Sequence, residues 1–302
     1  MRILVTGGTG FIGSYLVERL IANGELVISA SRRAKPAHPD AEHHVVDVGD
    51  AVAVERIGKV DAIVHLAGLA DASSSFADPL QYSRTNALGT LNMLEMARKS
   101  DAVFVFASSQ RVYRPQTAPL AEDCRRHPVD PYGYSKLIGE EWVQMYHEVF
   151  NLRTVVLRFF SVYGPGQALY GGTSGVVTIF VNKALKNEPL KVNDANLRDF
   201  TYVTDVVEGI VLALKEPVAI GNTYNIATGE ATSIGVLASV VKDVTGSQSA
   251  IVVAGNDCGE SYVADITRAR NELGYEPSVG LRRGLELYVE RLGEKRKGLA
   301  QS

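Results

Sequence analysis

The sequence has few of the residues that build disulfide frameworks, metal clusters or basic surfaces. Among its 302 residues are two cysteines, Cys124 and Cys258, too few for a disulfide framework or a multi-cysteine metal site. Lysine and arginine total 31 against 34 aspartates and glutamates, and the resulting net charge of −3 argues against a broad nucleic-acid-binding surface. We therefore expect reduced thiols, no bound metal and no nucleic-acid partner.

Long apolar segments are also missing. The chain contains no run of about 20 apolar residues that would span a membrane. Met1 and Arg2 lead into a short apolar run and then glycines, which is not the pattern of a signal peptide. Hydrophobic residues still make up 46% of the chain, enough to bury a core. These features predict a soluble, cytoplasmic protein with no membrane partner.

Short apolar segments alternate with helical patterns along the first half of the chain. The apolar segments are too short for helices and too uniformly apolar for half-solvated strands, so they suit a parallel sheet covered on both faces. They are Ile3–Thr6, Leu26–Ala30, His44–Val46, Ala62–Leu66, Val103–Ala107 and Thr154–Phe160. Helical patterns such as Ile12–Asn23 and Pro79–Ser100 lie between them. The alternation predicts an α/β fold with a doubly wound parallel sheet of the Rossmann type.

The pattern loosens after Tyr163, where glycines and prolines indicate a loop. Because the residues after Leu292 are mostly polar, we expect the tail from Gly293 to fray. The later elements expected are a strand at Thr223–Ala227 and helices at Val176–Lys186, from about Ser233, and over about Gly280–Leu292.

The first strand leads directly into a glycine-rich loop that opens a helix. Glycine recurs there at every third position: one permits the tight turn, the next lets the backbone approach a pyrophosphate, and the third lets helix pack on strand. Backbone N–H groups at the helix N-terminus then face the phosphates. The loop predicts a dinucleotide site, with a generic tight turn as the alternative. The cofactor-binding residues expected here are Gly7, Gly10, Phe11, Ile12 and Gly13.

The end of the second strand indicates which dinucleotide binds. An acidic residue there would bind the adenosine ribose hydroxyls, but the sequence has Ser31, Arg32 and Arg33. Two cations suit a 2′-phosphate, which favours NADP(H) over NAD; the alternative is a solvated basic turn. Asp47 and Val48 follow the third strand, and we expect them to contact the adenine.

These patterns divide the chain into two lobes. We predict a dinucleotide-binding lobe over residues 1–163, rejoined by parts of about 196–230. A smaller C-terminal lobe, mainly substrate-binding, is expected over residues 164–302.

A serine, a tyrosine and a lysine form a candidate catalytic set. Tyr132 and Lys136 are four residues apart on a predicted helix, so the ammonium lies near the phenol, lowers its pKa and makes tyrosinate a usable base. Ser109 ends a buried strand at the carboxyl end of the sheet, where its hydroxyl can orient a substrate oxygen. Tyrosine and lysine at this spacing are common on any helix, so the inference depends on the three features together.

This series of motifs resembles the extended short-chain dehydrogenases/reductases, in particular the NAD-dependent epimerase/dehydratase family, whose members act on nucleotide sugars. The resemblance runs from Met1 to about Leu292. The matching segments are Gly7–Gly13, His65–Gly68, Asn86–Thr90, Ser109–Tyr113, Pro131–Lys136, Leu157–Gln167, Arg198–Val207, Tyr224–Gly229 and Ala264–Ile266.

The resemblance assigns roles to the candidate catalytic residues. It implies that Tyr132 is the general base that removes a sugar hydroxyl proton, and that Lys136 lowers its pKa and holds the nicotinamide ribose. Ser109 would bind the reacting oxygen, and Asn86 would support the active site.

The resemblance also implies ligand contacts. Leu66 and Ala67 would line the cofactor, and Arg198 would hold the nucleotide diphosphate, to which its planar guanidinium is suited. The alternative for Arg198 is a salt bridge with Asp199 or Asp205. The substrate-binding residues implied are Ser109, Gln110, Ser161 and Arg198.

Departures from the family pattern narrow the chemistry. Gln110 and Arg111 stand where the 4,6-dehydratases carry an Asp-Glu pair, so that reaction is not expected. Gln110 can still bond a sugar hydroxyl, whereas Arg111 is expected to point into solvent. Ser161 replaces an asparagine common in the substrate loop. Residues 255–261 contain no arginine, where family members often have Arg and Asp for the nucleotide phosphate and ribose. This argues against uridine specificity and leaves thymidine, guanosine and cytidine sugars open.

The leading hypothesis is a nucleotide-sugar epimerase acting at C4 by reversible hydride transfer. The runner-up is an NADPH-dependent 4-keto-6-deoxysugar reductase, which would use the same residues and is favoured by Arg32 and Arg33. A third is a non-catalytic NADP(H)-binding regulator, against which the intact set of Ser109, Tyr132 and Lys136 argues.

A homodimer is also expected. The helices predicted at Pro79–Ser100 and Tyr132–Phe150 carry more apolar residues than one buried face needs. Family members pair through these two helices as a four-helix bundle.

Overall fold

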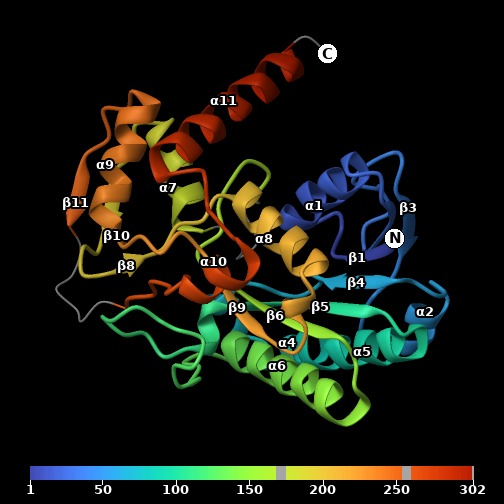
Figure 1. Ribbon diagram of the computed structural model, residues 1–302. Helices are drawn as coiled ribbons and strands as arrows, with labels where there is room; N and C mark the ends of the chain where they lie inside the picture. Colours follow the sequence, from blue (N-terminus) through green and yellow to red (C-terminus); the bar gives the residue numbers. More distant parts are fainter. Residues whose placement is uncertain (168–174, 254–259, 301–302) are drawn as a thin grey trace.

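A seven-stranded sheet, parallel throughout, forms the centre of the molecule (Figure 1). The computed structural model describes residues 1–167, 175–253 and 260–300, with side chains up to residue 293. The strand order is β3-β2-β1-β4-β5-β6-β9, so the direction of winding reverses between β1 and β4. The doubly wound parallel sheet predicted from the sequence is confirmed, with strand ends within two residues of those expected. The strands are β1 (Arg2–Thr6), β2 (Leu26–Ser31), β3 (Glu42–Val45), β4 (Ala62–His65), β5 (Val103–Ser109), β6 (Thr154–Phe159) and β9 (Thr223–Ile226).

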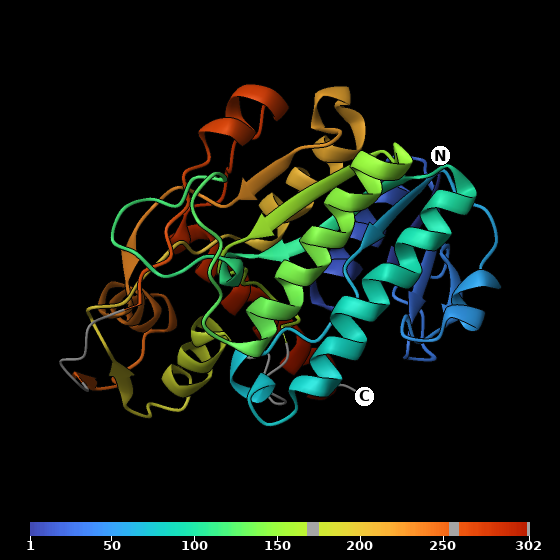
Figure 2. The ribbon, with the colours of Figure 1, turned by 90° about the horizontal axis from the view of Figure 1, so that it is seen from below.

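Helices cover both faces of this sheet because its strands are apolar on both sides. On one face, α1 (Phe11–Ala22) and α8 (Val203–Lys215) pack on buried side chains such as Val5 and Leu157. On the other, α5 (Gly89–Ser100) and α6 (Pro131–Phe150) pack on residues such as Phe104 and Phe106, with α2 (Ala51–Glu55) nearby. Figure 2 shows α5 and α6 side by side across that face.

The helix predicted over Pro79–Ser100 is divided into three segments. A short helix, α4 (Pro79–Tyr82), leads into a π-helix, η1 (Ser83–Leu88), before α5 begins at Gly89. The wider π turn carries Asn86, whose side chain forms hydrogen bonds with Leu69 and Ser135, outside its own helix. Single π turns inside α-helices are frequent at functional sites.

The C-terminal half forms a second core beside the sheet. Buried side chains of α7 (Val176–Ala184), α9 (Ile234–Thr245) and α11 (Leu281–Ala300) meet there, among them Phe180 and Leu237. The tail from Gly293 was predicted to fray, but α11 continues to Ala300 and projects from the body (Figure 1). The residues after Gly293 are mostly Glu, Lys, Arg, Leu and Ala, which favour helix.

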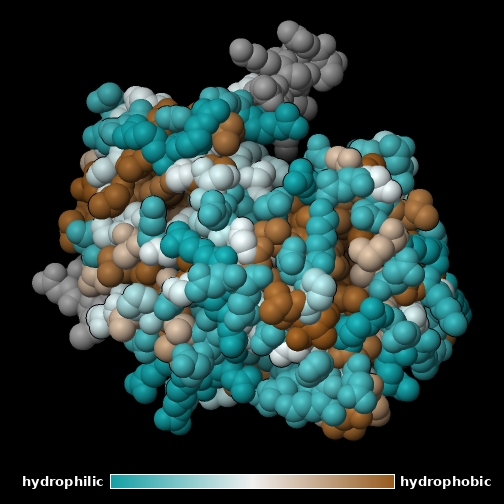
Figure 3. All heavy atoms as spheres, in the orientation of Figure 1, coloured by the Kyte–Doolittle hydropathy of each residue, from teal (hydrophilic) through white to brown (hydrophobic). Residues whose placement is uncertain are grey.

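Smaller elements complete the fold. They are β7 (Leu190–Val192), β8 (Leu197–Arg198), β10 (Thr232–Ser233), β11 (Ile251–Val253), α3 (Ala72–Ser75), α10 (Thr267–Leu273), η2 (Gln110–Val112) and η3 (Pro217–Ala219). β11 pairs with β7 and β10 with β8. The surface seen in Figure 3 is mostly hydrophilic, with a hydrophobic area beside α9 and β11.

Neither a membrane helix nor a metal cluster is found in the described part of the chain. None of its helices combines the length and apolarity needed to cross a bilayer. No group of three or more His, Cys, Asp or Glu side chains is placed there to hold a metal ion. Cys124 is a free, half-buried thiol, and Cys258 lies outside the described residues.

Two glycines let α6 lie unusually close to β5 and the turn that follows it. A Cβ added to Gly133 would lie 2.3 Å from the carbonyl oxygen of Arg111, and one added to Gly139 would lie 2.6 Å from the ring of Phe106. Such separations leave no room for a methyl group. The close approach sets the height of α6 above the strand.

Replacing Gly133 with alanine is therefore expected to destabilise the protein. Because the obstacle is a backbone oxygen, the free energy of unfolding should fall by about 1–3 kcal/mol in a denaturant titration. Gly293→Ala is the matched control: this helical glycine has open space around it, so the same change should stabilise by about 0.5–1 kcal/mol. A Gly133→Ala variant as stable as the wild type would contradict the packing argument.

Candidate active site

The candidate site lies at the carboxyl ends of the strands, where the winding reverses between β1 and β4. Ligands of open α/β sheets bind at such a point. The glycine loop follows β1, Ser109 ends β5, and Tyr132 and Lys136 lie on the first turns of α6. Three segments far apart in the sequence thus converge.

The glycine loop forms a tight cradle at the N-terminus of α1. Gly7 has a φ of 69°, and its Cβ, if present, would lie 2.9 Å from the backbone nitrogen of Ala67. A Cβ on Gly13 would lie 2.1 Å from the Gly7 oxygen. The N-cap, Gly10, makes no side-chain cap, and the first turn, which contains Phe11 and Ile12, has no acidic residue. This helix end suits a pyrophosphate group, so the residues present fit a dinucleotide.

The two arginines after β2, Arg32 and Arg33, lie in surroundings that differ from one another. Arg33 Nη1 donates to the carbonyl oxygen of Thr9 at 2.9 Å, so this side chain is tied to the glycine loop. Ser31 Oγ accepts from the Arg33 backbone N–H at 3.1 Å. Arg32 lines a cavity of about 400 Å³ together with Asp47 and Arg84. Sequence reasoning missed Arg84, because only the fold brings η1 to the ends of β2 and β3.

The other expected cofactor residues lie at neighbouring strand ends. Asp47 accepts the backbone N–H of Gly49 at 2.9 Å, and the buried side chain of Val48 packs against the backbone of η1 and α5 at Gly89. After β4, the backbone N–H groups of Leu66 and Ala67 donate to the carbonyl and the hydroxyl of Thr6, at 3.2 and 3.1 Å. These bonds hold the end of β4 against that of β1.

Tyr132, Ser109 and Lys136 come together and are all buried. Burial raises the pKa of Tyr132 to about 12, and a hydrogen bond with Ser109 opposes this rise. Burial also lowers the pKa of Lys136 to about 8. The sequence predicted that Lys136 lowers the pKa of Tyr132, but its Nζ donates to Ala107 O at 2.8 Å and lies 5.1 Å from the centre of the Phe106 ring. In this structure, burial dominates the pKa of the phenol.

Asn86 links the segment after β4 to the helix that carries Tyr132. Its Oδ1 accepts the Leu69 N–H at 2.8 Å, and its Nδ2 donates to Ser135 Oγ at 2.8 Å. The Ser135 hydroxyl in turn donates to the carbonyl oxygen of Tyr132 at 2.7 Å. The amide therefore fixes the first turn of α6 from outside the helix.

His65 extends this chain of bonds to β1 and was missed by sequence reasoning. Its Nδ1 lies 2.7 Å from Thr6 Oγ1, and its Nε2 lies 3.2 Å from Thr90 Oγ1. Because Thr6 accepts from Ala67 and Thr90 donates to Asn86 O, only the tautomer protonated at Nε2 gives every group a partner. Burial lowers the pKa of His65 to about 3, so the ring is neutral.

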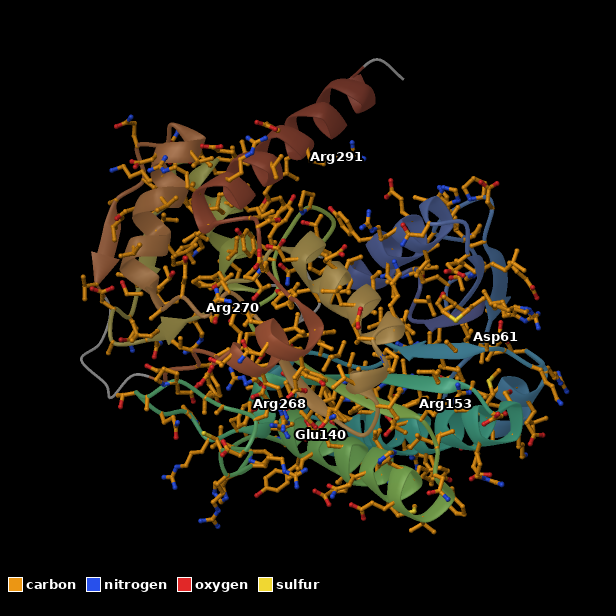
Figure 4. The ribbon with its side chains drawn as sticks, in the orientation of Figure 1. Asp61, Glu140, Arg153, Arg268, Arg270 and Arg291 are labelled. Carbon is orange, nitrogen blue, oxygen red and sulfur yellow. The ribbon has the colours of Figure 1, made fainter. Side chains whose placement is uncertain are left out.

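A buried ion pair supports the site from behind. Arg158 on β6 bonds Glu140 on α6 at 2.7 and 2.9 Å, and both side chains are almost fully buried. Glu140 also accepts from the hydroxyl of Ser108, the neighbour of Ser109. Glu140 lies on the side of α6 that faces α10, which carries Arg268 (Figure 4). The pair connects α6 to two adjacent strands, β5 and β6.

The residues expected to bind the sugar lie together. Gln110 Nε2 lies 3.4 Å from Ser161 Oγ, and among the described residues Gln110 Oε1 has no hydrogen-bond partner. Ser161 has a φ of 26°, in the left-handed region that a serine rarely adopts. Strained backbone of this kind is frequent at ligand sites.

The structure corrects the prediction for Arg111 and the alternative ion-pair partners considered for Arg198. Arg111 was expected to point into solvent, but its guanidinium contacts the carboxylates of Asp130 at 3.4 Å and Glu260 at 3.3 Å. For Arg198, Asp199 and Asp205 were the alternative partners. Asp199 instead accepts from Thr228, Gly229 and Ala264, and Asp205 from Ser278 and Val279. Arg198 pairs with Glu260 at 3.7 Å, a contact between distant segments that sequence spacing does not reveal.

Comparison with known proteins places this site in a family. Residues 3–227 match the NAD dependent epimerase/dehydratase family. UDP-glucuronic acid decarboxylase 2 of Arabidopsis thaliana is 34% identical over 96% of this chain and 68% of its own length.

Two solved structures have the same fold over nearly their whole length. The UDP-glucose 4-epimerase of Thermotoga maritima, in complex with UDP-glucose, has a TM-score of 0.92 and 32% identity, covering 98% of this chain and 99% of its own. The UDP-glucuronic acid 4-epimerase of Bacillus cereus, in complex with UDP-glucuronic acid and NAD, has a TM-score of 0.87 and 29% identity, covering 98% and 100%.

The buried ammonium of Lys136 predicts an unusual dependence of stability on pH. Its pKa of about 8 lies below the ordinary value of 10.5. Between these pH values the unfolded chain binds more protons than the folded protein, so stability rises with pH. We expect the free energy of unfolding of the wild type to increase between pH 8 and pH 10 by about 2 kcal/mol relative to Lys136→Met, in denaturant titrations. Parallel pH profiles for the two proteins would contradict this.

Proposed function

The chain belongs to the NAD-dependent epimerase/dehydratase family, and we propose that within it the protein is a nucleotide-sugar epimerase acting at C4. The observation that carries this proposal is that Ser109, Tyr132 and Lys136 are buried together, with Lys136 one turn from Tyr132, at the switch point of the sheet beside the glycine loop. The two solved relatives act as 4-epimerases on UDP-sugars, in agreement with it.

The proposed reaction moves one proton and one hydride in each direction. Nicotinamide, when bound, supplies the acceptor that takes the C4 hydride and later returns it. Tyr132 Oη takes the proton of the C4 hydroxyl as general base and gives it back to the same oxygen after the sugar has turned. Ser109 Oγ orients that oxygen, and its bond to the phenol favours the ionised form. Lys136, whose Nζ donates to Ala107 O, would bind the nicotinamide ribose.

The cofactor and substrate are assigned to the two lobes. The glycine loop, with Asp47, Val48, Leu66 and Ala67, would hold the dinucleotide within residues 1–163, and residues 164–302 would mainly hold the sugar nucleotide. Arg198 is suited to the diphosphate, because a guanidinium forms paired bonds to phosphate oxygens. Gln110 and Ser161 would bond the sugar hydroxyls.

A second candidate is an NADPH-dependent reductase of 4-keto-6-deoxysugars. It is favoured by the absence of an acidic residue at Ser31–Arg33 and by the cavity that Arg32 and Arg84 line. These cations are suited to a 2′-phosphate, so we propose a preference for NADP(H). The Bacillus cereus relative was solved with NAD, which makes cofactor choice a property to measure on this chain.

We also propose a homodimer that pairs through α5 and α6. Large apolar side chains are exposed on α6 and on the residue that precedes α5. They are Leu88, Tyr134, Ile138, Val149 and Phe150. A second copy packed against these helices would cover them.

The function is tested by incubating the protein with a panel of nucleotide sugars, with and without NADPH. Epimeric product without net cofactor consumption is expected; stoichiometric NADPH oxidation with 4-keto sugars would favour the reductase, and turnover of neither would refute both. Tyr132→Phe should lower kcat about a thousandfold and leave cofactor binding unchanged, since only Oη is lost. Tyr134→Phe, on the exposed side of the same helix, is the control and should retain activity.

Cofactor choice is tested by fluorescence titration with NADPH and NADH. We expect NADPH to bind about tenfold more tightly, because charge-assisted bonds to its 2′-phosphate add affinity. Arg32→Gln should remove most of this preference and leave NADH binding unchanged. Arg56→Gln, an exposed arginine on α2's C-cap, is the control for loss of one positive charge. Equal affinity of the wild type for both nucleotides would show that the basic turn is only a solvated one.

A further inference from the structure

Two arginines and two carboxylates surround one buried tyrosine beside the candidate catalytic residues. Arg111 and Arg198 lie over the Tyr262 ring, with their guanidinium carbons 5.2 and 5.3 Å from its centre. Glu260 contacts both, at 3.3 Å from Arg111 and 3.7 Å from Arg198, and Asp130 contacts Arg111 at 3.4 Å. These five residues are here called the Tyr262 cluster.

The two carboxylates of the Tyr262 cluster are held very differently. The side chain of Asp130 is 3% exposed and caps α6 by accepting the Gly133 N–H at 2.7 Å, so it is fixed. The side chain of Glu260 is 46% exposed, and within the described part of the chain its polar contacts are with the two arginines. Glu260 is therefore the carboxylate that can move away from the arginines without disturbing a helix.

Removal of the Glu260 carboxylate would leave the cluster with a net positive charge. Arg111 and Arg198 are close enough to repel one another, and burial together with that repulsion lowers the pKa of Arg198. Glu260 is the anion that both arginines share. Without it, two guanidinium groups would face a single fixed carboxylate, and an incoming anion would be attracted to them.

The cluster also lies within electrostatic reach of the chemistry. Arg111 is two residues beyond Ser109, and Asp130 is two residues before Tyr132. The charge of Asp130 raises the pKa of Tyr132, and that of Arg111 lowers it. An anion that binds at these arginines is therefore held next to the reacting groups.

We propose that Glu260 is an internal competitor for the diphosphate of the nucleotide sugar, occupying the arginines that the substrate must bind. The inference rests on the proposed function. A diphosphate carries enough charge to displace one carboxylate and to bond both guanidinium groups, whereas a neutral sugar or a nucleoside does not. Glu260 thus weakens binding of ligands that carry a diphosphate and leaves the binding of a nucleoside unchanged.

The test is calorimetric binding of nucleoside diphosphates to the whole protein. UDP, dTDP, GDP and CDP are titrated into the wild type, and the tightest binder is used for the variants. Glu260→Gln should bind it about three- to tenfold more tightly, since an ion pair no longer has to be broken. Glu188→Gln is the matched control: it removes one negative charge from an exposed turn and should change affinity less than twofold. The parent nucleoside should show no difference between the proteins.

A double-mutant cycle with Arg198→Gln separates competition from a structural effect. In that background Glu260 has lost the partner that the ligand needs, so Glu260→Gln should change affinity less than twofold. An equal gain with and without Arg198, or no gain in Glu260→Gln over the control, would overturn the inference while leaving the proposed function intact. Failure of all four diphosphates to bind either the wild type or Glu260→Gln would overturn both.

Discussion

The close contact between α6 and β5 is the constraint on which the rest of the site depends. Tyr132 and Lys136 belong to the helix and Ser109 to the strand, so their separation is set by how deeply the helix sits. At Gly133 the backbone of α6 packs against the backbone of Arg111, and at Gly139 it packs against the Phe106 ring. That approach lets Lys136 reach the Ala107 carbonyl and Tyr132 bond Ser109. A helix one methyl group farther out would separate all of these pairs.

Several charged and polar groups are buried around this helix, and the fold provides them with partners. Lys136 is held by a backbone carbonyl, and neutral His65 by two threonines. The buried pair of Arg158 and Glu140 is bonded on several sides, as buried ions must be to offset the loss of water. Lys136 and Glu140 thus hold α6 against β5 and β6. Gln110 Oε1 is one of four buried polar atoms without a partner among the described residues, and its place beside Ser161 suits it to ligand contact.

What the sequence predicted well is what short segments determine. Apolar runs located the strands, and the glycine spacing located the turn after β1, because both depend on neighbours along the chain. Wrong predictions concerned contacts between distant segments or competing forces. Arg111 and Arg198 find Glu260 only after β5, β8 and the segment before α10 have been brought together. The helix around Asn86 widened into a π turn because that side chain bonds Leu69 and Ser135. The prediction that Lys136 lowers the pKa of Tyr132 took the lysine charge into account but not the burial of the phenol, which raises that pKa.

The place of β9 has a consequence for how this chain can be taken apart or recombined. The chain leaves the sheet after β6, contributes α7 to the C-terminal core, and returns with α8 to add β9 as the last strand beside β6. It then leaves the sheet again and adds α9 and α11 to the same core. Asn225 of β9 also bonds Tyr113, so the returning strand closes over the buried ion pair. A fragment cut after residue 163 would leave β6 as an open, apolar edge, which invites aggregation. The C-terminal core is therefore built from two separate stretches of chain, one between β6 and β9 and one after β9. An exchange of this part between relatives would need three junctions.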